Sequence, residues 1–418
     1  MTINKTFQKF LGEVLSLVEK HCGKTFTKEL QSLRIERERL LNNIWREDIF
    51  PEKLELYQKD SIFRDIDFDT TIHYAYKYLT MQDYLELLYE IAEISIKYSE
   101  FQKGEHLLQL IATKHRLHAD KKLLAKVQQN LGIVNSYRNN FIAANKHFNK
   151  SLQLFTLLND TKGSVAIKND IGILLIEQGN LSEGEALFKE AREMAKSEEF
   201  SEYIAKTNMN LGNISHMRGD SDNAINYYQM ALDVIDKDAE YNYDTFARIY
   251  INIALAHKSQ KQFSKSLEYL HNSLDLSKKT NNKYTRGLSY LVEAEVYCHK
   301  GNYSTSTAIA TTAFSIFSEI GDRLSMGEAY KIFGIINRKS KRFDIALSYF
   351  ENSKRINKEF NNKLNLAETL VEIAYLYRDT GETSRAIKNF KLASKHFEKI
   401  GASLRIEKIN EAIKELSL

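Results

Sequence analysis

Residues 131–152 read LGIVNSYRNNFIAANKHFNKSL, and the order of small and bulky residues in this stretch predicts the fold. The small residue Gly132 is followed nine positions later by Phe141, and Ala144 and Phe148 follow at further steps of three and four. Apolar residues at such spacings share one face of a helix. The polar residues before Phe141 predict a tight turn. The stretch therefore predicts two short helices that pack against each other as a hairpin.

The same pattern recurs along most of the chain. The first small residue of each copy is, in order, Ala92, Gly132, Gly172, Gly212, Ala254, Ala294, Gly334 and Ala374. Neighbouring copies are 40 residues apart, except for one step of 42 between positions 212 and 254. A fixed period of this length is typical of stacked helical repeats, each packed on its neighbours. Glycines 179, 219 and 301 are predicted to end first helices with a positive φ.

The composition agrees with an all-helical chain. Among 418 residues there is one proline, Pro51, where an average chain would use about 5%. The net charge of +4, from 59 basic and 55 acidic residues, does not by itself indicate a nucleic-acid or membrane partner. The two cysteines, Cys22 and Cys298, fit a reducing compartment. The sequence shows no signal peptide and no membrane-spanning run, so we expect a cytoplasmic protein.

The repeat resembles the tetratricopeptide repeat (TPR), whose usual period is about 34 residues. The resemblance extends over residues 84–400. It implies an all-α fold, a right-handed superhelical solenoid of helix-turn-helix repeats. The predicted organisation is an N-terminal helical module at 1–80, eight repeats at 84–400 and a C-terminal capping helix at 402–418.

In TPR arrays the first helix of each repeat lines a concave groove, and by this analogy we expect a peptide-binding groove. Asparagines there can bind a peptide main chain because their amides donate and accept hydrogen bonds. Lysines and arginines there can bind a peptide carboxylate. The alternative is that the asparagines only join neighbouring helices and the cations are a solvated face. The predicted groove residues are Asn130, Asn169, Asp170, Lys206, Asn210, Asn213, Arg248, Asn252, Lys331, Arg338 and Arg378.

The first eighty residues differ from the repeats. The apolar and turn residues predict short helices at 5–21, 27–33, 36–46 and 52–59, with Pro51 in the first turn of the last. Their spacing is similar to that of a phage-repressor helix-turn-helix module. Together with the long repeats, it resembles the Rap, Rgg, NprR and PlcR group of intracellular peptide-pheromone receptors.

This resemblance implies a DNA or partner contact on the second and third short helices. The candidate residues are Arg34, Arg37, Arg39, Asn42 and Asn43. Residues 24–46 hold six Lys or Arg against three Glu, a local excess of only +3. DNA affinity depends on phosphate neutralisation, so DNA binding would require a homodimer. The alternative is a degenerate helical bundle that caps the array or binds a protein partner, as in the Rap branch.

Motifs for catalysis are absent from the sequence. It contains no phosphate-binding glycine loop, no nucleophile elbow and no HExxH zinc helix, so we expect no enzyme, no metal and no cofactor. The leading hypothesis is a cytoplasmic quorum-sensing receptor whose groove binds a short peptide or an extended protein segment and controls the N-terminal module, including transcription regulation. The alternatives are a passive scaffold for protein–protein interaction without DNA binding and a Rap-like modulator of a response regulator.

Overall fold

The computed structural model describes residues 2–46, 68, 70–98, 100–113, 116–138, 140–236 and 239–416. Over these ranges the chain consists of helices joined by short turns, and none of the described residues is in a β-strand. The chain forms two compact units, unit 1 (Met1–Asp160) and unit 2 (Thr161–Leu418). None of the described helices is both long and apolar enough to span a bilayer.

The described part of unit 1 contains a long N-terminal helix and, further along the chain, two helix pairs. Its described helices are α1 (Thr2–Arg46), α3 (Met81–Lys97), α4 (Phe101–Thr113), α5 (Lys121–Tyr137) and α6 (Phe141–Leu157). Helix α1 changes direction at Gly23, whose φ of 83° and ψ of 168° are not helical. Apolar side chains on both sides of this bend, including Phe10 and Phe26, join one core with α3, α4 and α5. The N-terminal segment is therefore packed on the first repeat.

The prediction of two separate short helices at 27–33 and 36–46 was wrong. Helix α1 runs without interruption from the bend at Gly23 to Arg46. The physical reason is that residues 33–36, Leu-Arg-Ile-Glu, contain neither glycine nor proline and are compatible with a helix interior. The turn that a helix-turn-helix module needs is thus absent from α1. The predicted helix at 52–59 and Pro51 lie outside the described residues.

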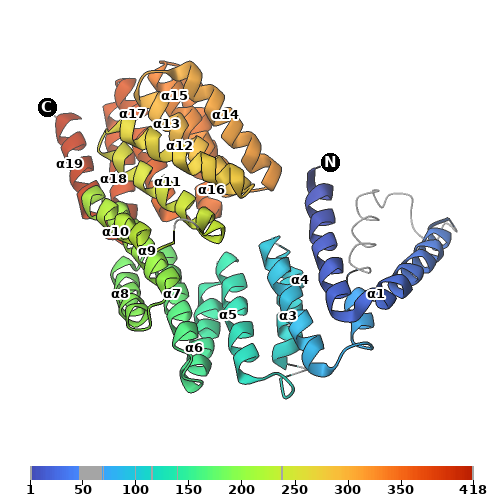
Figure 1. Cartoon of the computed structure of the whole chain (residues 1–418). Coiled ribbons are helices and arrows are strands. Elements are labelled where there is room, and N and C mark those ends of the chain that lie inside the picture. The colour runs from blue at the N-terminus through green and yellow to red at the C-terminus, as the bar shows by residue number, and fades with distance from the viewer. Residues whose placement is uncertain are drawn as a thin grey trace. The chain divides into compact units, whose positions relative to one another are not determined.

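Unit 2 consists of six helix pairs and a final helix, which follow one another side by side from green to red in Figure 1. The first helices of its pairs are α7 (Thr161–Gln178), α9 (Ser201–Arg218), α11 (Tyr243–Ser259), α13 (Lys283–His299), α15 (Arg323–Lys339) and α17 (Lys363–Asp379). The second helices are α8 (Leu181–Ser197), α10 (Ser221–Asp233), α12 (Phe263–Lys279), α14 (Tyr303–Ile320), α16 (Phe343–Glu359) and α18 (Thr383–Lys399). A short 3₁₀ helix, η1 (Glu240–Asn242), precedes α11, and α19 (Ser403–Leu416) follows the last pair.

The turns inside the pairs use the left-handed backbone conformation. Gly179, Gly219 and Gly301 have φ values of 92°, 93° and 82°, as the sequence predicted. In other repeats a lysine takes this place, with φ of 60° at Lys261 and 59° at Lys341. The repeat therefore keeps the turn geometry even where a residue other than glycine must adopt the less favourable positive φ.

Small residues of the first helices make room for aromatic rings of the second helices. A Cβ atom added at Gly172 would lie 2.5 Å from Cε1 of Phe188, which is far inside van der Waals contact. The same overlap would occur between Gly334 and Phe350. Both rings are fully buried. The repeated spacing of small and aromatic residues is thus explained by close packing of the two helices.

We expect Gly334→Val to lower the free energy of unfolding by about 2–3 kcal/mol, in the upper part of the range for overpacked cores. The reason is that even the first added carbon overlaps the ring of Phe350. Urea unfolding followed by circular dichroism would measure the change. The control is Ser315→Val at an exposed site of α14, for which we expect no more than about 1 kcal/mol. Equal stabilities of the two variants would contradict the packing account.

The two ends of unit 2 contact each other. Apolar residues of α8 and α9, including Leu181 and Ile214, share a core with Ile400 and Ile409 near the C-terminus. Nζ of Lys363 donates a hydrogen bond of 2.7 Å to the carbonyl oxygen of residue 178 at the end of α7. Cations suit these carbonyls because the last turn of a helix leaves its oxygens without intrahelical partners. The contact holds the first and last pairs of unit 2 together.

Candidate functional site

Four of the predicted asparagines form hydrogen-bonded pairs across neighbouring first helices. Nδ2 of Asn210 on α9 donates to Oδ1 of Asn169 on α7 over 2.8 Å. Nδ2 of Asn252 on α11 donates to Oδ1 of Asn213 on α9 over 3.0 Å. We call these four residues the asparagine row. Their amides lie along three consecutive first helices of unit 2.

The asparagine row is only partly shielded from solvent. Asn210, Asn213 and Asn252 are half-buried, and Asn169 is buried. An asparagine amide carries two N–H donors and a carbonyl oxygen with two lone pairs. The bond from Asn210 to Asn169 uses one N–H group of Asn210 and leaves its second N–H and its oxygen outside that bond. The row can therefore join helices and still offer amide groups to a ligand.

The other predicted residues near the row are placed as follows. Lys206 on α9 pairs with Glu202, with 2.6 Å between Nζ and Oε1. Arg248 on α11 is exposed, and Asp170 on α7 is half-buried. Asn130 belongs to unit 1, where it is buried and its Nδ2 donates to the hydroxyl of Tyr89 over 3.2 Å.

The predicted cations of the later repeats already bind carboxylates. Lys331 is 7% exposed, and its Nζ lies 2.7 Å from carboxylate oxygens of both Glu328 and Glu368. Arg338 is 6% exposed, and it pairs with Asp379 over 2.6 Å and with Glu372 over 3.0 Å. A peptide carboxylate at Lys331 or Arg338 would have to replace these partners.

Arg378 is more accessible than these two cations. Its Nη2 lies 3.0 Å from a carboxylate oxygen of Asp379, and its guanidinium lies 4.6 Å from the centre of the Tyr375 ring. The stacked, planar guanidinium keeps its outer edge available for a further hydrogen-bond acceptor.

Lys331 belongs to a row of alternating charges that sequence reasoning missed. These charges are Lys258, Glu295, Lys331, Glu368 and Arg405, on α11, α13, α15, α17 and α19 respectively, and we call them the charge line. Direct ion pairs join Lys258 to Glu295 over 2.5 Å, Lys331 to Glu368 over 2.7 Å and Glu368 to Arg405 over 2.9 Å. The two partners of each ion pair are 37 positions apart in the sequence, which is three fewer than the usual step of 40 between repeats.

The cations of the charge line control the ionisation of its carboxylates. Burial alone would raise the pKa of Glu368, but Lys331 and Arg405 outweigh it and lower the pKa to about 2. Burial raises the pKa of Glu328 even though Lys331 lies beside it, and Oε1 of Glu328 has no hydrogen-bond partner in the described part of the chain. Burial, together with Arg405 and Lys258, lowers the pKa of His216 to about 4, so this imidazole is neutral at pH 7.

Arg405 connects the charge line to the first repeats of unit 2. Besides Glu368, its guanidinium donates to two backbone carbonyl oxygens near the end of α9, over 2.9 Å to Met217 and over 3.3 Å to His216. This bridge lies next to the apolar contact between the ends of the unit. The charge line is thus part of what holds unit 2 together.

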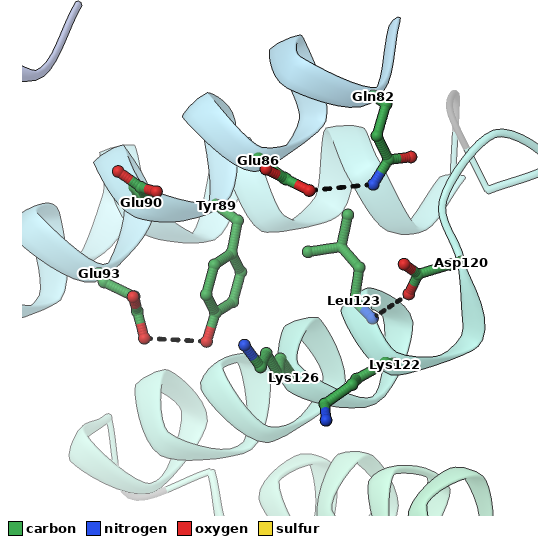
Figure 2. Close-up of a pocket in the computed structure, with 9 residues that line it drawn as sticks. All are labelled: Gln82, Glu86, Tyr89, Glu90, Glu93, Asp120, Lys122, Leu123 and Lys126. Atoms are coloured by element: carbon green, nitrogen blue, oxygen red, sulfur yellow. Dashed lines mark hydrogen bonds between the residues drawn. The ribbon is translucent and has the colours of Figure 1, made fainter. Parts of the chain in front are cut away.

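Unit 1 contains a separate polar pocket of about 360 Å³ between α3 and α5. Figure 2 shows Glu86, Glu90 and Glu93 on the α3 side and Lys122 and Lys126 on the α5 side. The remaining lining residues are Gln82, Tyr89, Asp120 and Leu123. The sequence does not distinguish this pocket, because its carboxylates occur among many others on helix surfaces.

Tyr89 connects the pocket to the predicted residue Asn130. The hydroxyl of Tyr89 donates to Oε1 of Glu93 over 2.9 Å and accepts the bond from Asn130 (Figure 2 shows the first). Burial and the neighbouring Glu93 raise the pKa of Tyr89. The tyrosine therefore stays protonated and acts as a hydrogen-bonding group in the wall of the pocket.

The predicted DNA-contact residues all lie within the helical span of α1. Arg39 is exposed. The side chains of the other candidates lie outside the described residues; these are Arg34, Arg37, Asn42 and Asn43. Within the described ranges, no group of three or more His, Cys, Asp or Glu side chains could hold a metal ion.

Comparison with known proteins supports the repeat fold. Models of the tetratricopeptide repeat match residues 164–237 and residues 246–283. No curated protein sequence matches the chain. The two family matches lie in unit 2, over the helices that carry the asparagine row and the start of the charge line.

Solved structures with a similar fold cover most of the chain. The Rap conjugation gene regulator of plasmid pLS20, in complex with the Phr* peptide, has 14% identity and a TM-score of 0.56 over 95% of this chain and 97% of its own. The apo form of the quorum sensor NprR from B. thuringiensis has 12% identity and a TM-score of 0.56, covering 81% and 94%. Aspartyl phosphate phosphatase F from Bacillus subtilis has 13% identity and a TM-score of 0.54, covering 94% and 93%. Residues 164–237 and 246–283 therefore match the tetratricopeptide repeat, and the fold of the chain resembles that of the Rap and NprR structures.

Proposed function

We propose that the protein is a cytoplasmic regulator that binds a short peptide or an extended protein segment on the asparagine row. The observation that carries the proposal is the pairing of Asn210 with Asn169 and of Asn252 with Asn213. These bonds fix the amides in place before a ligand arrives, which lowers the entropy cost of binding. The amide groups outside the bonds can hydrogen-bond to a peptide main chain whatever its sequence.

The similar structures support this proposal at the level of fold. Two of them are complexes with a bound ligand, the Phr* peptide in the pLS20 regulator and the competence and sporulation factor in another Rap protein. The second structure has 14% identity to this chain and a TM-score of 0.51. A shared fold does not specify a ligand, so the asparagine row carries the argument for this chain.

The accessible cations favour a peptide with an acidic group. Lys206 and Arg248 lie on α9 and α11, the helices that carry Asn210 and Asn252. Lys206 forms a surface pair with Glu202, which water and salt weaken, and its Nζ lies 5.2 Å from the centre of the Tyr203 ring. The buried cations Lys331 and Arg338 are less suited to this role because their present carboxylates would be left unpaired. We therefore place the acidic end of the peptide near α9 and α11.

The output of the regulator is assigned to a protein contact of the N-terminal segment. Glu13 on α1 binds both Lys97, over 2.9 Å, and the hydroxyl of Tyr98, over 2.6 Å. His21 on α1 lies 3.4 Å from Glu90 on α3. An N-terminal helix tied to the first repeat in this way, without the turn of a helix-turn-helix module, supports a protein partner rather than DNA.

The double substitution Asn210→Ala and Asn252→Ala tests the proposal. Short peptides would first be selected from a random library on the wild-type protein, and their dissociation constants then measured by fluorescence anisotropy. We expect the double variant to bind every selected main-chain ligand at least about tenfold more weakly, since each lost hydrogen bond contributes about 1 kcal/mol.

A matched control removes two asparagines from the second helices. Asn352 and Asn389 each bond only to a carbonyl oxygen of their own helix, Ser348 and Arg385 respectively. The variant Asn352→Ala and Asn389→Ala is expected to keep the wild-type affinity. Unchanged binding in the Asn210 and Asn252 variant, with the helical content preserved, would refute peptide binding on the asparagine row.

A further inference from the structure

The last second helix, α18, has an unusual charge distribution. Between Glu382 and Glu398 its sequence contains no acidic residue. The other second helices of unit 2 that contain lysines pair them with carboxylates three or four positions away, as Lys196 does with Glu193 on α8, Lys278 with Asp275 on α12 and Lys354 with Glu351 on α16. On α18 the only such pair joins Arg385 to Glu382, at the start of the helix.

Four lysines of α18 remain uncompensated. Lys388, Lys391, Lys395 and Lys399 are all exposed. Steps of three, four and four residues place them on one face of the helix. No carboxylate of the described residues forms an ion pair with any of them. We call these four lysines the cationic face.

A large apolar side chain lies within the cationic face. Leu392 is 43% exposed, and it follows Lys388 by four residues and precedes Lys395 by three. An exposed leucine surrounded by charged residues has the layout of a small protein interface, with an apolar centre and a polar rim. Single exposed leucines are common on surfaces, so the argument depends on the leucine and the lysines together.

The pKa of a neighbouring histidine, His396, is lowered by burial and by the positive charges of this region. Burial lowers the pKa of His396, and Lys399, Lys358 and Lys363 lower it further, with no carboxylate acting against them. Nδ1 of His396 is buried and has no hydrogen-bond partner among the described residues. The charges around this end of α18 therefore repel one another, and an anionic partner would relieve that repulsion.

Folding does not require the cationic face. The positions 40 residues before the four lysines and Leu392 form the same helix in the repeat, and they hold Ser348, Glu351, Asn352, Arg355 and Glu359 on α16. Like charges one turn apart destabilise a helix by a few tenths of a kcal/mol per pair. A second helix of this repeat therefore forms without the four lysines and the exposed leucine.

We propose that the cationic face of α18 docks an acidic helix or acidic surface of a partner protein, with an apolar residue of the partner against Leu392. The charge of the face is complementary to carboxylates spaced one turn apart. Leu392 favours a protein over a nucleic acid, since phosphates would leave it without an apolar contact. The face also has no aromatic side chain on which bases could stack. This surface is on the second helix α18 and is separate from the asparagine row, which lies on first helices.

Two synthetic helical peptides of identical composition test the proposal. One has glutamates and a leucine on a single face, and the other has the same residues distributed around the helix. We expect the full-length protein, in about 0.15 M salt, to bind the first peptide at least about tenfold more tightly than the second in fluorescence anisotropy. The double variant Lys388→Glu and Lys395→Glu should lose this difference, and Leu392→Ser should weaken binding by about fivefold.

The matched control is Lys162→Glu with Lys265→Glu, which changes the net charge equally at two exposed lysines on α7 and α12. It should bind the patterned peptide as the wild type does. Equal affinity for the two peptides would overturn the proposal. So would tighter binding of a short DNA duplex that is insensitive to Leu392→Ser, because that result identifies a nucleic-acid surface. The Asn210→Ala and Asn252→Ala variant does not alter α18, so this test is independent of the proposed peptide site.

Discussion

Replacing Lys331 with alanine is expected to lower the free energy of unfolding by about 3–5 kcal/mol, the range for removal of one partner from a buried ion pair. The ammonium group of Lys331 lies between the carboxylates of Glu328 and Glu368, 2.7 Å from each. Without it, two acidic groups would face each other in a buried site. Only Arg405 would remain as a direct partner of Glu368.

The effect should depend on pH in a defined direction. The folded-state pKa of Glu368, about 2, is below the usual value of about 4.3. The ionised Glu368 therefore stabilises the wild type above about pH 4.3, and this contribution is lost as the pH falls toward 2. The stability gap between wild type and variant should narrow over the same window.

Denaturant unfolding of the wild type and Lys331→Ala at neutral and acidic pH measures both expectations. Lys354→Ala is the control, because Lys354 and Glu351 form an ordinary pair at the surface. We expect Lys354→Ala to lower the free energy of unfolding by less than about 1 kcal/mol at any pH. A loss as small as this in Lys331→Ala would mean that the charge line does not stabilise unit 2.

Phe350→Ala is expected to lower the free energy of unfolding by about 3–5 kcal/mol, the usual range when a core phenylalanine is replaced by alanine. Phe350 is fully buried on α16, and its ring fills the space left by Gly334 on α15. The same relation joins Phe188 to Gly172, so the variant tests the packing rule of the whole array. The cavity that Phe350→Ala leaves would collapse only partly, because other contacts hold the backbones of α15 and α16 in place.

Thermal unfolding monitored by circular dichroism provides the measurement for Phe350. Tyr284→Ala on α13 is the control, because Tyr284 is half-exposed and loses less apolar contact. We expect a clearly smaller decrease in the unfolding temperature for the control. Similar decreases for both variants would show that the small-and-aromatic pairs are not the main packing contact.

The repeat architecture was predictable because its signal is local. The small residue and the aromatic of one repeat, such as Gly334 and Phe350, are 16 positions apart, and both are fixed by contacts within a single helix pair. The repetition of this pattern along the chain made each copy evidence for the others. The left-handed turns at Gly179 and Gly219 followed from the same reasoning.

The charge line was missed because its members are not at the repeat period. Lys331 and Glu368 are 37 positions apart in the sequence, and so are Glu368 and Arg405. The second partner of each ion pair therefore lies three residues, or about one helical turn, before the position that matches the first partner in the next repeat. A search for opposite charges at the period minus three residues would have found them. In the sequence analysis Lys331 was instead assigned to a peptide carboxylate.

The N-terminal segment was poorly predicted because short apolar patterns do not show where a helix breaks. The pattern at 27–33 and 36–46 fits either two short helices or one long one, and only Gly23 marks a break that the structure contains. The bonds between asparagines were likewise not predictable in detail. The amide geometry depends on how far apart Asn169 and Asn210 are held by their helices.

The most direct test of the account is the response of the asparagine side-chain amides to a peptide. Their NH₂ signals can be assigned in the wild type by comparison with Asn210→Ala and Asn252→Ala and followed by NMR during titration with a library-selected peptide. The account predicts that the signals of Asn210 and Asn252 shift with a midpoint equal to the dissociation constant, whereas those of Asn352 and Asn389 stay in place. A saturating peptide that leaves the Asn210 and Asn252 signals unmoved would contradict it.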